Sequence, residues 1–461
     1  MGIIQHREAL ATTPLRAAAL DIVEAGIARV LPARIMGDAV RYDATDQVLK
    51  VAGDAYRISR GRFFVIGGGK AAGLMAAALE RIIGSERITA GVVTDKGTGF
   101  KTKKVRVLTA GHPVPDERGT AGVREMLSLK EQHQIGQDDI VLCLISGGGS
   151  ALLPYPVAGV SLEDKQGITE LLLGSGAEIT EINTVRKHLS RIKGGQLGKH
   201  FAPATVISLI LSDVIGDDLS SITSGLTYPD TTTFRDACQV LERYQLRARA
   251  PHGVTDYLEK GLRHQVPETP RRLSNCHNYI IGNNHLALEA MRQKAEATGF
   301  AACLLTGEQR GETAAVAQYR AEEIINGTHR QCSALLIGGE TTPGLPLNPG
   351  RGGRNQHYAL VTMRALRDYP RQWVMASVGT DGSDFLPDVA GAVVDSNSLP
   401  KAAALGLDAL SYLERYDSNT LLSKLGDSLI VTGNTGTNVG DVVVYLFDQD
   451  QHNPGELAEK G

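Results

Sequence analysis

Short apolar runs that end in glycine and polar residues recur along this chain, and they restrict its fold more than any other feature. The clearest are FFVIGGGK (63–70), GVVTDKG (91–97), IVLCLISGGGS (140–150), ISLILSDVIGDD (207–218), ALLIGGETT (334–342), VMASVGTDGSD (374–384) and LIVTGNTGTN (429–438). Runs of this kind predict buried strands, and in open α/β sheets the ends of such strands lie together and form the ligand site. The pattern therefore predicts an α/β protein whose chemistry lies at the strand ends.

The spacing of these runs predicts two domains. From Phe63 to about Leu211, strands alternate with helical stretches, as in a parallel sheet covered by helices on both faces. From about Leu241 to Asn275 the sequence is charged and carries no strand pattern, and strands resume at Tyr279. We therefore predict a first α/β domain over residues 1–245, a helical connection over 246–275 and a second α/β domain over 276–461.

The composition is that of a folded protein with a small-molecule partner. Of the 461 residues, 42% are hydrophobic and 21% are charged, and the formal net charge is -3. This balance gives no general attraction to nucleic acid or to an anionic membrane. No apolar run approaches the ~20 residues of a membrane span. The five cysteines show no short-range pairing, so we expect reduced cysteines and a cytoplasmic location.

The first glycine loop supports two interpretations. Gly67, Gly69 and Ala72 satisfy the pattern G-x-G-x-x-G/A, and Asp95 ends the next strand, as in a dinucleotide site. Lys70 lies inside the glycine turn, however, and a cation there suits a transferred phosphate or a substrate carboxylate better. A structural turn is the third interpretation of the same glycines.

The second glycine loop and two aspartate groups suit phosphate and magnesium. Ser146–Ser150 lets an anion approach the backbone closely, although a tight turn is the alternative. Carboxylates follow one apolar run in each predicted domain, and these are Asp213, Asp217 and Asp218, and then Asp381 and Asp384. Magnesium takes one or two carboxylates together with waters and phosphate oxygens, whereas aspartate is also common in turns.

Cationic side chains occur in two further places. Arg186 and Lys193 are seven residues apart, so we expect them on one face of a helix that Asn183 caps and that stops at Gly194. A solvated helix face is the alternative. Arg351 and Arg354 lie in a glycine-rich loop, where bidentate binding of a carboxylate or phosphate is favoured. A lone His112 between turn residues is more typical of a structural role.

Taken in order, the motifs resemble those of the MOFRL-type (class II) glycerate kinases. The resemblance spans nearly the whole chain and rests on FFVIGGGKAAGLMA, TAGHPVPDERG, LISGGGSALLPYP, INTVRKHLSRIKGGQL, LILSDVIGDDLSSITSG, YPDTTTF, GGETT, RGGRNQ, GTDGSD and TGTNVGDV. The chain departs from the family pattern at Leu226 and Phe385. The resemblance implies a Rossmann-like parallel-sheet domain joined to a second, mixed-sheet α/β domain, with the active site in the cleft between them.

The same resemblance implies the activity and the site residues. It implies phosphorylation of D-glycerate to 2-phosphoglycerate with ATP and Mg²⁺, by a monomer or homodimer. Lys70, Arg354 and Asp213 would be catalytic, and Asp213 and Asp381 would bind the metal. The residues implied near phosphate, nucleotide or substrate are Gly68, Gly69, Ser146, Gly147, Gly148, Gly149, Ser150, Arg186, Lys193, Asn355 and Asn438.

Two other functions stay open from the sequence. One is an NAD(P)H-dependent hydroxypyruvate reductase, a label that some members of this family have carried. Such an enzyme would bind its cofactor with the Gly67 pattern and Asp95. A sugar-acid sensor would keep the cleft and bind glycerate without turnover. Lys70 and the other anion-suited loops favour the kinase over the reductase.

Overall fold

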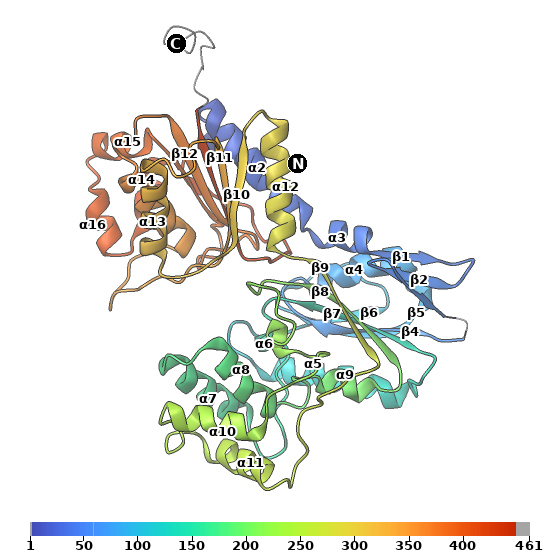
Figure 1. Cartoon of the computed structure of the whole chain (residues 1–461). Helices are drawn as coiled ribbons and strands as arrows, with labels where there is room; N and C mark the ends of the chain where they lie inside the picture. Colours follow the sequence, from blue (N-terminus) through green and yellow to red (C-terminus); the bar gives the residue numbers. More distant parts are fainter. Residues whose placement is uncertain (1, 59, 449–461) are drawn as a thin grey trace, which may run out of the picture. The chain divides into compact units, whose positions relative to one another are not determined.

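The computed structural model describes residues 2–58 and 60–448, which form two compact units (Figure 1). The parallel-sheet unit comprises Leu31–Asn283 and Gly436–Val439. The mixed-sheet unit comprises Met1–Val30, Asn284–Thr435 and Gly440–Gly461. Each unit has its own sheet, so the two-domain α/β fold expected from the sequence is confirmed.

The parallel-sheet unit is built on a sheet of six parallel strands. These are β4 (Phe63–Gly68), β5 (Ile88–Asp95), β6 (Val105–Thr109), β7 (Ile140–Ser146), β8 (Thr205–Leu211) and β9 (Cys276–Gly282), in the order β6-β5-β4-β7-β8-β9. Every residue of β4 and β7 is buried, because helices cover both faces and leave no position for alternating polar residues. Counted from β4, this is the doubly wound order 3-2-1-4-5-6.

The chain changes direction across this sheet between β4 and β7. From β4 it passes through α4 (Ala72–Ile83) to β5 on one side, and from β7 it continues to β8 on the other. In Figure 1, α3 (Pro32–Ala39) and α4 cover one face of the sheet, and α5 (Glu117–Gln132) and α9 (Gln196–Phe201) cover the opposite face. In doubly wound sheets the ligand crevice lies outside the carboxyl ends of the two strands at such a switch point.

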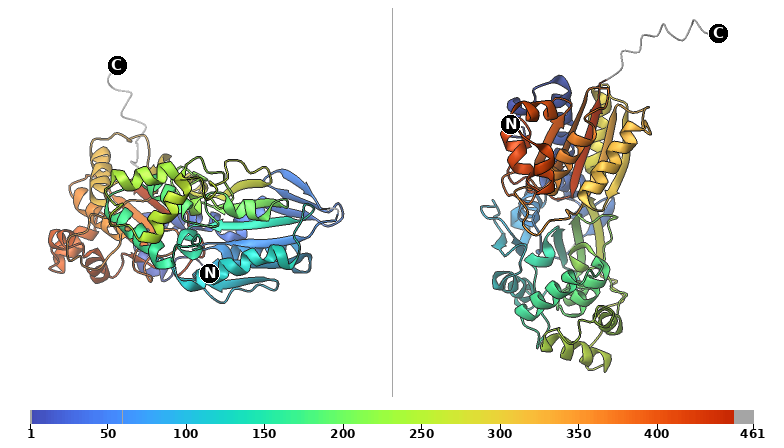
Figure 2. Two further views of the ribbon diagram at one scale, coloured as in Figure 1. Left: turned by 90° about the horizontal axis from the view of Figure 1, so that it is seen from below. Right: turned by 90° about the vertical axis from the view of Figure 1, so that its left-hand side faces the viewer.

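A helical layer and a small meander complete this unit. The layer consists of α7 (Leu162–Gly174), α8 (Ile179–His188), α10 (Phe234–Arg243) and α11 (His252–Leu262), which share one buried apolar cluster and lie together in Figure 2, in green to yellow-green. The meander, which the sequence analysis did not predict, is β1 (Val40–Asp43), β2 (Val48–Val51) and β3 (Asp54–Arg57). Short helical pieces are η1 (Ser85–Arg87), α6 (Gly149–Leu152) and η2 (Ile222–Ser224).

The mixed-sheet unit contains a second six-stranded sheet. Its strands are β10 (Ala302–Gln309), β11 (Ala334–Gly339), β12 (Trp373–Gly379), β13 (Gly391–Asp395), β14 (Leu429–Ile430) and β15 (Asp441–Phe447), in the order β10-β11-β15-β12-β13-β14. Neighbours β10 and β11 are parallel, and the other neighbouring pairs are antiparallel. Figure 1 shows α2 (Pro14–Arg29) and α12 (Asn284–Ala297) on one face, and α13 (Thr313–Ile325) and α14 (Arg354–Ala365) on the other. The remaining helices are α1 (Arg7–Leu10), α15 (Ser398–Ala404), α16 (Ala409–Glu414) and α17 (Ser418–Leu425).

The unit boundaries differ from the predicted 1–245, 246–275 and 276–461. Helix α2 packs on the mixed sheet, where the buried Arg16 donates from Nε to Asp395 Oδ2 over 2.7 Å. Strand β9, expected in the second domain, pairs with β8 of the first sheet. The predicted connection contains α11, which packs in the helical layer. Packing between distant segments decides to which unit each of these elements belongs. Local strand or helix patterns in the sequence do not predict that packing.

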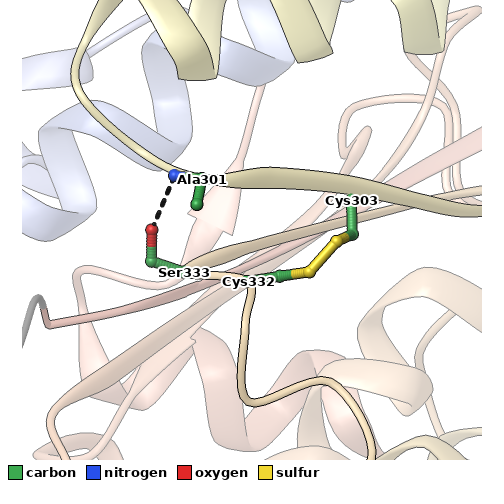
Figure 3. The surroundings of a disulfide bond; sticks show 4 residues. All are labelled: Ala301, Cys303, Cys332 and Ser333. Carbon is green, nitrogen blue, oxygen red and sulfur yellow. Dashed lines mark hydrogen bonds between the residues drawn. A yellow bond between two sulfur atoms is a disulfide. The ribbon is translucent and has the colours of Figure 1, made fainter.

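One disulfide corrects the expectation that all cysteines are reduced. Cys303 lies in β10 and Cys332 lies just before β11, and their sulfur atoms are bonded (Figure 3). The two Cα atoms are 5.9 Å apart, within the range that a disulfide spans. Because 29 residues separate the pair, only the pairing of β10 with β11 brings the two cysteines together.

Within residues 2–58 and 60–448, none of the helices combines the length and the apolar character needed to cross a membrane.

Candidate functional site

The two glycine loops at the switch point pack against each other. A Cβ on Gly67 would lie 1.9 Å from the carbonyl oxygen of Leu144, and a Cβ on Gly69 would lie 2.2 Å from Ser146 Oγ. Both glycines have positive φ, at 133° and 145°. Lys70 N donates to the carbonyl oxygen of Gly147 over 2.8 Å. Glycine is thus required for the close approach of the loops, and the predicted role in phosphate contact is not needed to explain it.

Two more residues predicted to bind phosphate have clear structural contacts. Ser146 Oγ accepts a hydrogen bond from Ala71 N at 2.9 Å, so this buried hydroxyl holds the entry to α4. A Cβ on Gly68 would lie 2.3 Å from Thr94 Oγ1 and 2.9 Å from Leu153 Cγ. Ser146 and Gly68 therefore shape the loops from behind.

Backbone amides engage both carboxylate oxygens of Asp95. Its Oδ2 accepts from Gly73 N at 2.9 Å and its Oδ1 accepts from Gly97 N at 2.8 Å. The side chain is buried, and this burial raises the pKa of Asp95 to about 6. Both carboxylate oxygens are used to fix the start of α4 and the turn after β5, so the acidic residue of the dinucleotide interpretation has another task.

Asp213 and Asn438 lie beside the second glycine loop. A Cβ on Gly147 would lie 1.9 Å from Asp213 Oδ2 and 2.6 Å from Asn438 Nδ2. The amide Nδ2 of Asn438 donates to Asp213 Oδ2 over 2.9 Å. Gly147, the second residue of the loop, thus has room only for a hydrogen atom, and the carboxylate lies directly against the backbone.

Lys70 and His112 lie next to the following residue of the same loop. Gly148 has φ of 79°, and a Cβ there would lie 2.9 Å from His112 Nε2 and 3.0 Å from Lys70 Cγ. The tertiary structure therefore gathers Lys70, Asp213 and Asn438 around Gly147 and Gly148, all within the parallel-sheet unit. It adds His112, which the sequence pattern indicated as structural.

Thr223 and Ser224 are further residues that sequence reasoning missed. Both have positive φ, at 50° and 56°, which is a strained conformation for a β-branched residue such as Thr223. A Cβ on Gly149 would lie 2.6 Å from Thr223 Oγ1. Such strain concentrates at functional sites. The signal available in the sequence was the run SSITSG directly after the Asp213 loop.

A cavity of about 320 Å³ opens beside Gly148 and Ser150. Three cationic side chains line it, and these are Lys165 of α7, Arg186 of α8 and Lys193. The predicted helix carrying both Arg186 and Lys193 is wrong, because α8 begins at Ile179 and ends at His188. Asn183 is accordingly inside α8, where its Oδ1 accepts from Ser224 Oγ at 3.0 Å. Arg186 and Lys193 nevertheless reach the same cavity.

These three cations are strongly desolvated. Burial lowers the pKa of Lys165 to about 7, with a smaller contribution from Arg186. Burial, together with the charges of Lys165 and Arg186, holds the pKa of Lys193 well below its usual range. Lys193 Nζ donates to the carbonyl oxygen of Thr223 at 3.2 Å and to Ser150 Oγ at 3.5 Å. Among the described residues, none accepts a hydrogen bond from the buried Lys165 Nζ.

In the mixed-sheet unit, Arg354 is already paired with carboxylates. Its Nε and Nη2 donate to the two carboxylate oxygens of Asp441 at 2.5 and 2.9 Å, and its Nη1 lies 2.7 Å from Glu340 Oε1. This bidentate pair fixes the first residue of α14. Two carboxylates offset the charge of Arg354, so its attraction for a further anion is weaker than the sequence suggested.

Asn355 and the two aspartates of this unit have different surroundings. Asn355 is buried, and its N and Nδ2 donate to Asp384 Oδ1 at 3.0 and 3.2 Å. Asp384 thereby caps α14, a structural role. Asp381 Oδ1 accepts from Ser383 N at 2.9 Å. The described residues contain no group of three or more histidine, cysteine or acidic side chains arranged to hold a metal ion.

Comparison with known proteins gives consistent results along the chain. Residues 18–259 match the family described as domain of unknown function DUF4147, and residues 333–441 match the MOFRL family. A protein of Pyrococcus horikoshii named glycerate 2-kinase is 39% identical over 93% of this chain and 98% of its own length. A protein of Agrobacterium vitis named putative hydroxypyruvate reductase is 38% identical over 84% of this chain and 100% of its own. The crystal structure of a glycerate kinase from Thermotoga maritima has a TM-score of 0.80 and 36% identity, covering 94% of this chain and 99% of that one.

Proposed function

Because the chain belongs to the family of MOFRL-type glycerate kinases, we propose that it transfers a phosphoryl group from ATP to D-glycerate and forms 2-phosphoglycerate. One observation carries the proposal. At the switch point of the parallel sheet, Lys70 lies beside Gly148, and Asp213 lies beside Gly147 with Asn438 bonded to it. A cation, a carboxylate and a glycine loop are parts that suit phosphoryl transfer, since the reaction depends on positioning and charge compensation.

Lys70 is the residue that we assign to the reacting phosphoryl group or the glycerate carboxylate. It enters the loop directly before α4, and its Cγ lies within 3.0 Å of the position that a Cβ on Gly148 would take. A side chain larger than hydrogen at Gly148 would crowd the Lys70 side chain at Cγ. Lys70 would therefore neutralise charge that builds up on oxygen atoms held at the loop.

Asp213 is the residue that we assign to the metal or to the glycerate hydroxyl. Its carboxylate suits Mg²⁺, which prefers one or two carboxylates together with waters and phosphate oxygens. The hydrogen bond from Asn438 restricts its rotation. Magnesium bound there would supply charge neutralisation for the phosphates. Held in this orientation, Asp213 can instead accept the hydrogen bond of the attacking hydroxyl.

Two further predicted site residues, Arg354 and Asp381, lie in the mixed-sheet unit. Arg354 is held by Asp441 and Glu340, and Asp381 lies in the turn after β12. That these two residues act on the same substrate as Lys70 stays a prediction. The same is true of the domain cleft expected from the sequence.

The reductase is the second candidate, because some relatives carry the name hydroxypyruvate reductase. Its required acidic residue is Asp95, whose two oxygens accept hydrogen bonds from Gly73 N and Gly97 N. Asp95 is also only 1% exposed, so its side chain is turned to the backbone and not to solvent. This favours the kinase.

A single experiment with two arms separates the two functions. The purified protein is incubated with D-glycerate, ATP and Mg²⁺, and in parallel with hydroxypyruvate and NADH or NADPH, and the products are identified by phosphorus and proton NMR. We expect ATP-dependent 2-phosphoglycerate in the first arm only. Formation of 3-phosphoglycerate would change the position of transfer, and glycerate formed only in the second arm would overturn the kinase.

A further inference from the structure

The cavity lined by Lys165, Arg186 and Lys193, here called the cationic cavity, brings like charges together in a buried place. Lys165 is 7% exposed and Lys193 is 1% exposed, and the charges of Lys165 and Arg186 add to burial in lowering the pKa of Lys193. Glu170 is the only carboxylate lining the described part of the cavity, and it is an exposed side chain. Burying like charges without a counter-charge is unfavourable, so the arrangement suits an anion with several negative groups.

A second observation, the missing hydrogen-bond acceptor of Lys165, also indicates that an anion binds in the cavity. The Nζ of Lys165 is buried, and the described residues offer it no hydrogen-bond acceptor. An ammonium group has three donors, and buried donors normally have partners. A ligand oxygen would supply one. The sequence analysis did not identify Lys165 as a site residue, because EDKQG is typical of an ordinary polar stretch of a helix.

Apolar side chains line another part of the cavity, which reaches the surface. Val114 and Leu173 line it and are 63% and 58% exposed, and three prolines, Pro113, Pro115 and Pro154, lie beside them. A volume of about 320 Å³ is at the lower end of the range of about 300–1,000 Å³ that is usual for larger organic ligands. A three-carbon acid would leave most of this space and the apolar wall uncovered. A nucleotide has both the charged chain and the flat apolar ring that the two parts of the cavity match.

The cavity also joins the loop that carries the reacting groups. Gly148 and Ser150 line it, and Gly148 lies beside Lys70. A chain of phosphates lying along the three cations would therefore end at the loop where we assign phosphoryl transfer.

We propose that the cationic cavity binds the nucleotide substrate, with its polyphosphate on Lys165, Arg186 and Lys193 and its base on the Val114 and Leu173 wall. The choice of nucleotide as occupant rests on the proposed kinase function. The assignment of this cavity, and of Lys165 in particular, goes beyond it.

Binding should be linked to proton uptake, because burial and the charge of Arg186 lower the pKa of Lys165 to about 7. The other titratable groups that line the cavity are Arg186, Lys193, His112 and Glu170. A polyphosphate stabilises the charged form of the lysine, so at pH 8 the protein should take up a proton when the nucleotide binds. A residue with a merely structural role would not change this proton count when replaced.

The test is isothermal titration calorimetry with the non-hydrolysable analogue AMP-PNP and Mg²⁺, without glycerate, in buffers of different ionisation enthalpy at pH 8. We expect Lys165→Met to raise Kd at least tenfold and to reduce the proton uptake. Lys260→Met removes an exposed lysine of α11 and is the control of equal charge, expected to match the wild type. Inorganic tripolyphosphate should compete with AMP-PNP, and D-glycerate should not.

A surface variant protects the test against misfolding of Lys165→Met. Leu173→Asp places a negative charge on the exposed wall and should weaken AMP-PNP binding at least fivefold, whereas Leu405→Asp, at a similarly exposed leucine, should leave Kd unchanged. If both Lys165→Met and Leu173→Asp bind AMP-PNP within twofold of the wild type, the cavity is not the nucleotide site. A rise in the KM for D-glycerate with an unchanged Kd for AMP-PNP would likewise overturn the proposal and assign the cavity to the acid.

The outcome is separable from that of the proposed function. If the protein binds AMP-PNP in a Lys165-dependent way but forms no phosphoglycerate, the cavity is the nucleotide site and the kinase assignment is wrong. A protein that forms 2-phosphoglycerate with nucleotide binding insensitive to both variants keeps the kinase and loses this inference.

Discussion

Asn438 Nδ2 donates a hydrogen bond to Asp213 Oδ2 over 2.9 Å, although 225 residues separate the two in the chain. The segment Gly436–Val439 belongs to the parallel-sheet unit, while the residues before and after it belong to the other unit. A short return of the chain therefore delivers an amide to the carboxylate at the glycine loop. This contact makes the orientation of Asp213 dependent on the late part of the sequence.

Replacement of Asn438 by alanine should lower kcat/KM about 10- to 100-fold and raise the Mg²⁺ concentration needed for half-maximal rate, because partners that orient a metal ligand have effects of this size. A magnesium titration of the steady-state rate measures both. Asn397→Ala removes an exposed asparagine that makes no capping bond and should behave as the wild type. An unchanged magnesium titration in Asn438→Ala would show that Asn438 does not orient a metal ligand.

Replacement of Lys70 by alanine should lower kcat about 10²-fold or more, because a lost charge-stabilising donor has an effect of this size. Lys70→Arg keeps the charge and should recover part of the rate. Lys50→Ala, at an exposed lysine of β2, is the control for a lost positive charge. Steady-state kinetics at saturating ATP and glycerate would count against the assignment if Lys70→Ala stayed within about threefold of the wild type.

Gly148 and Gly159 form a matched pair for the glycine loop. Both have positive φ, at 79° and 87°, but a Cβ on Gly159 would meet nothing within 4 Å, whereas one on Gly148 would crowd His112 and Lys70. Alanine at either position should destabilise the fold by about 1 kcal/mol through backbone strain. Gly148→Ala alone should lower kcat/KM, by about tenfold or more. Equal activity of the two variants, measured beside their unfolding curves, would show that Gly148 does not face the reacting groups.

The buried His357 should make the mixed-sheet unit less stable in acid. It is stacked on Tyr416 with 3.7 Å between ring centroids, and burial lowers the pKa of His357 to about 4. Between the pKa of the unfolded chain, about 6.5, and that value, the unfolded state binds a proton that the folded state does not, so the free energy of unfolding falls as pH falls, by up to about 3 kcal/mol.

His357→Phe keeps the stacking and removes the proton. Between pH 7 and pH 4.5, the free energy of unfolding measured with urea should fall less for this variant than for the wild type. The effects of other titrating groups are common to both proteins and cancel in the comparison. An identical loss in both proteins would mean that His357 stays accessible to protons in the folded state.

The disulfide between Cys303 and Cys332 predicts a thiol count. Under denaturing conditions without reductant, Cys143, Cys238 and Cys276 should react with Ellman's reagent, and reduction should raise the count from three to all five cysteines. Closing this loop should stabilise the unit by about 3–4 kcal/mol, so Cys303→Ser should lower the urea midpoint. Five reactive thiols before reduction would show that the two sulfur atoms are not bonded in the purified protein.

Local patterns were sufficient for the elements that depend on neighbouring residues. Continuous apolar runs such as Ile140–Ser146 predict strands buried on both faces, and the glycines and aspartates after them mark the end of the sheet where a ligand binds. For this reason the sequence predicted the parallel sheet, and it selected Lys70, Asp213 and Asn438, which meet at one loop. These side chains follow strand ends, and the topology of such sheets brings strand ends together.

Features that depend on distant partners could not be predicted in this way. Whether Asp95 faces a ligand or caps α4 depends on where Gly73 N lies, and whether β9 joins the first sheet depends on the free edge of β8. Lys165 lies in a polar helical stretch, and only the packing of α7 against α8 turns it into a desolvated cation in a cavity. The residue types at a strand end or a turn can be identified from neighbouring residues. The burial of a side chain and the identity of its hydrogen-bond partners depend on contacts between residues far apart in the chain.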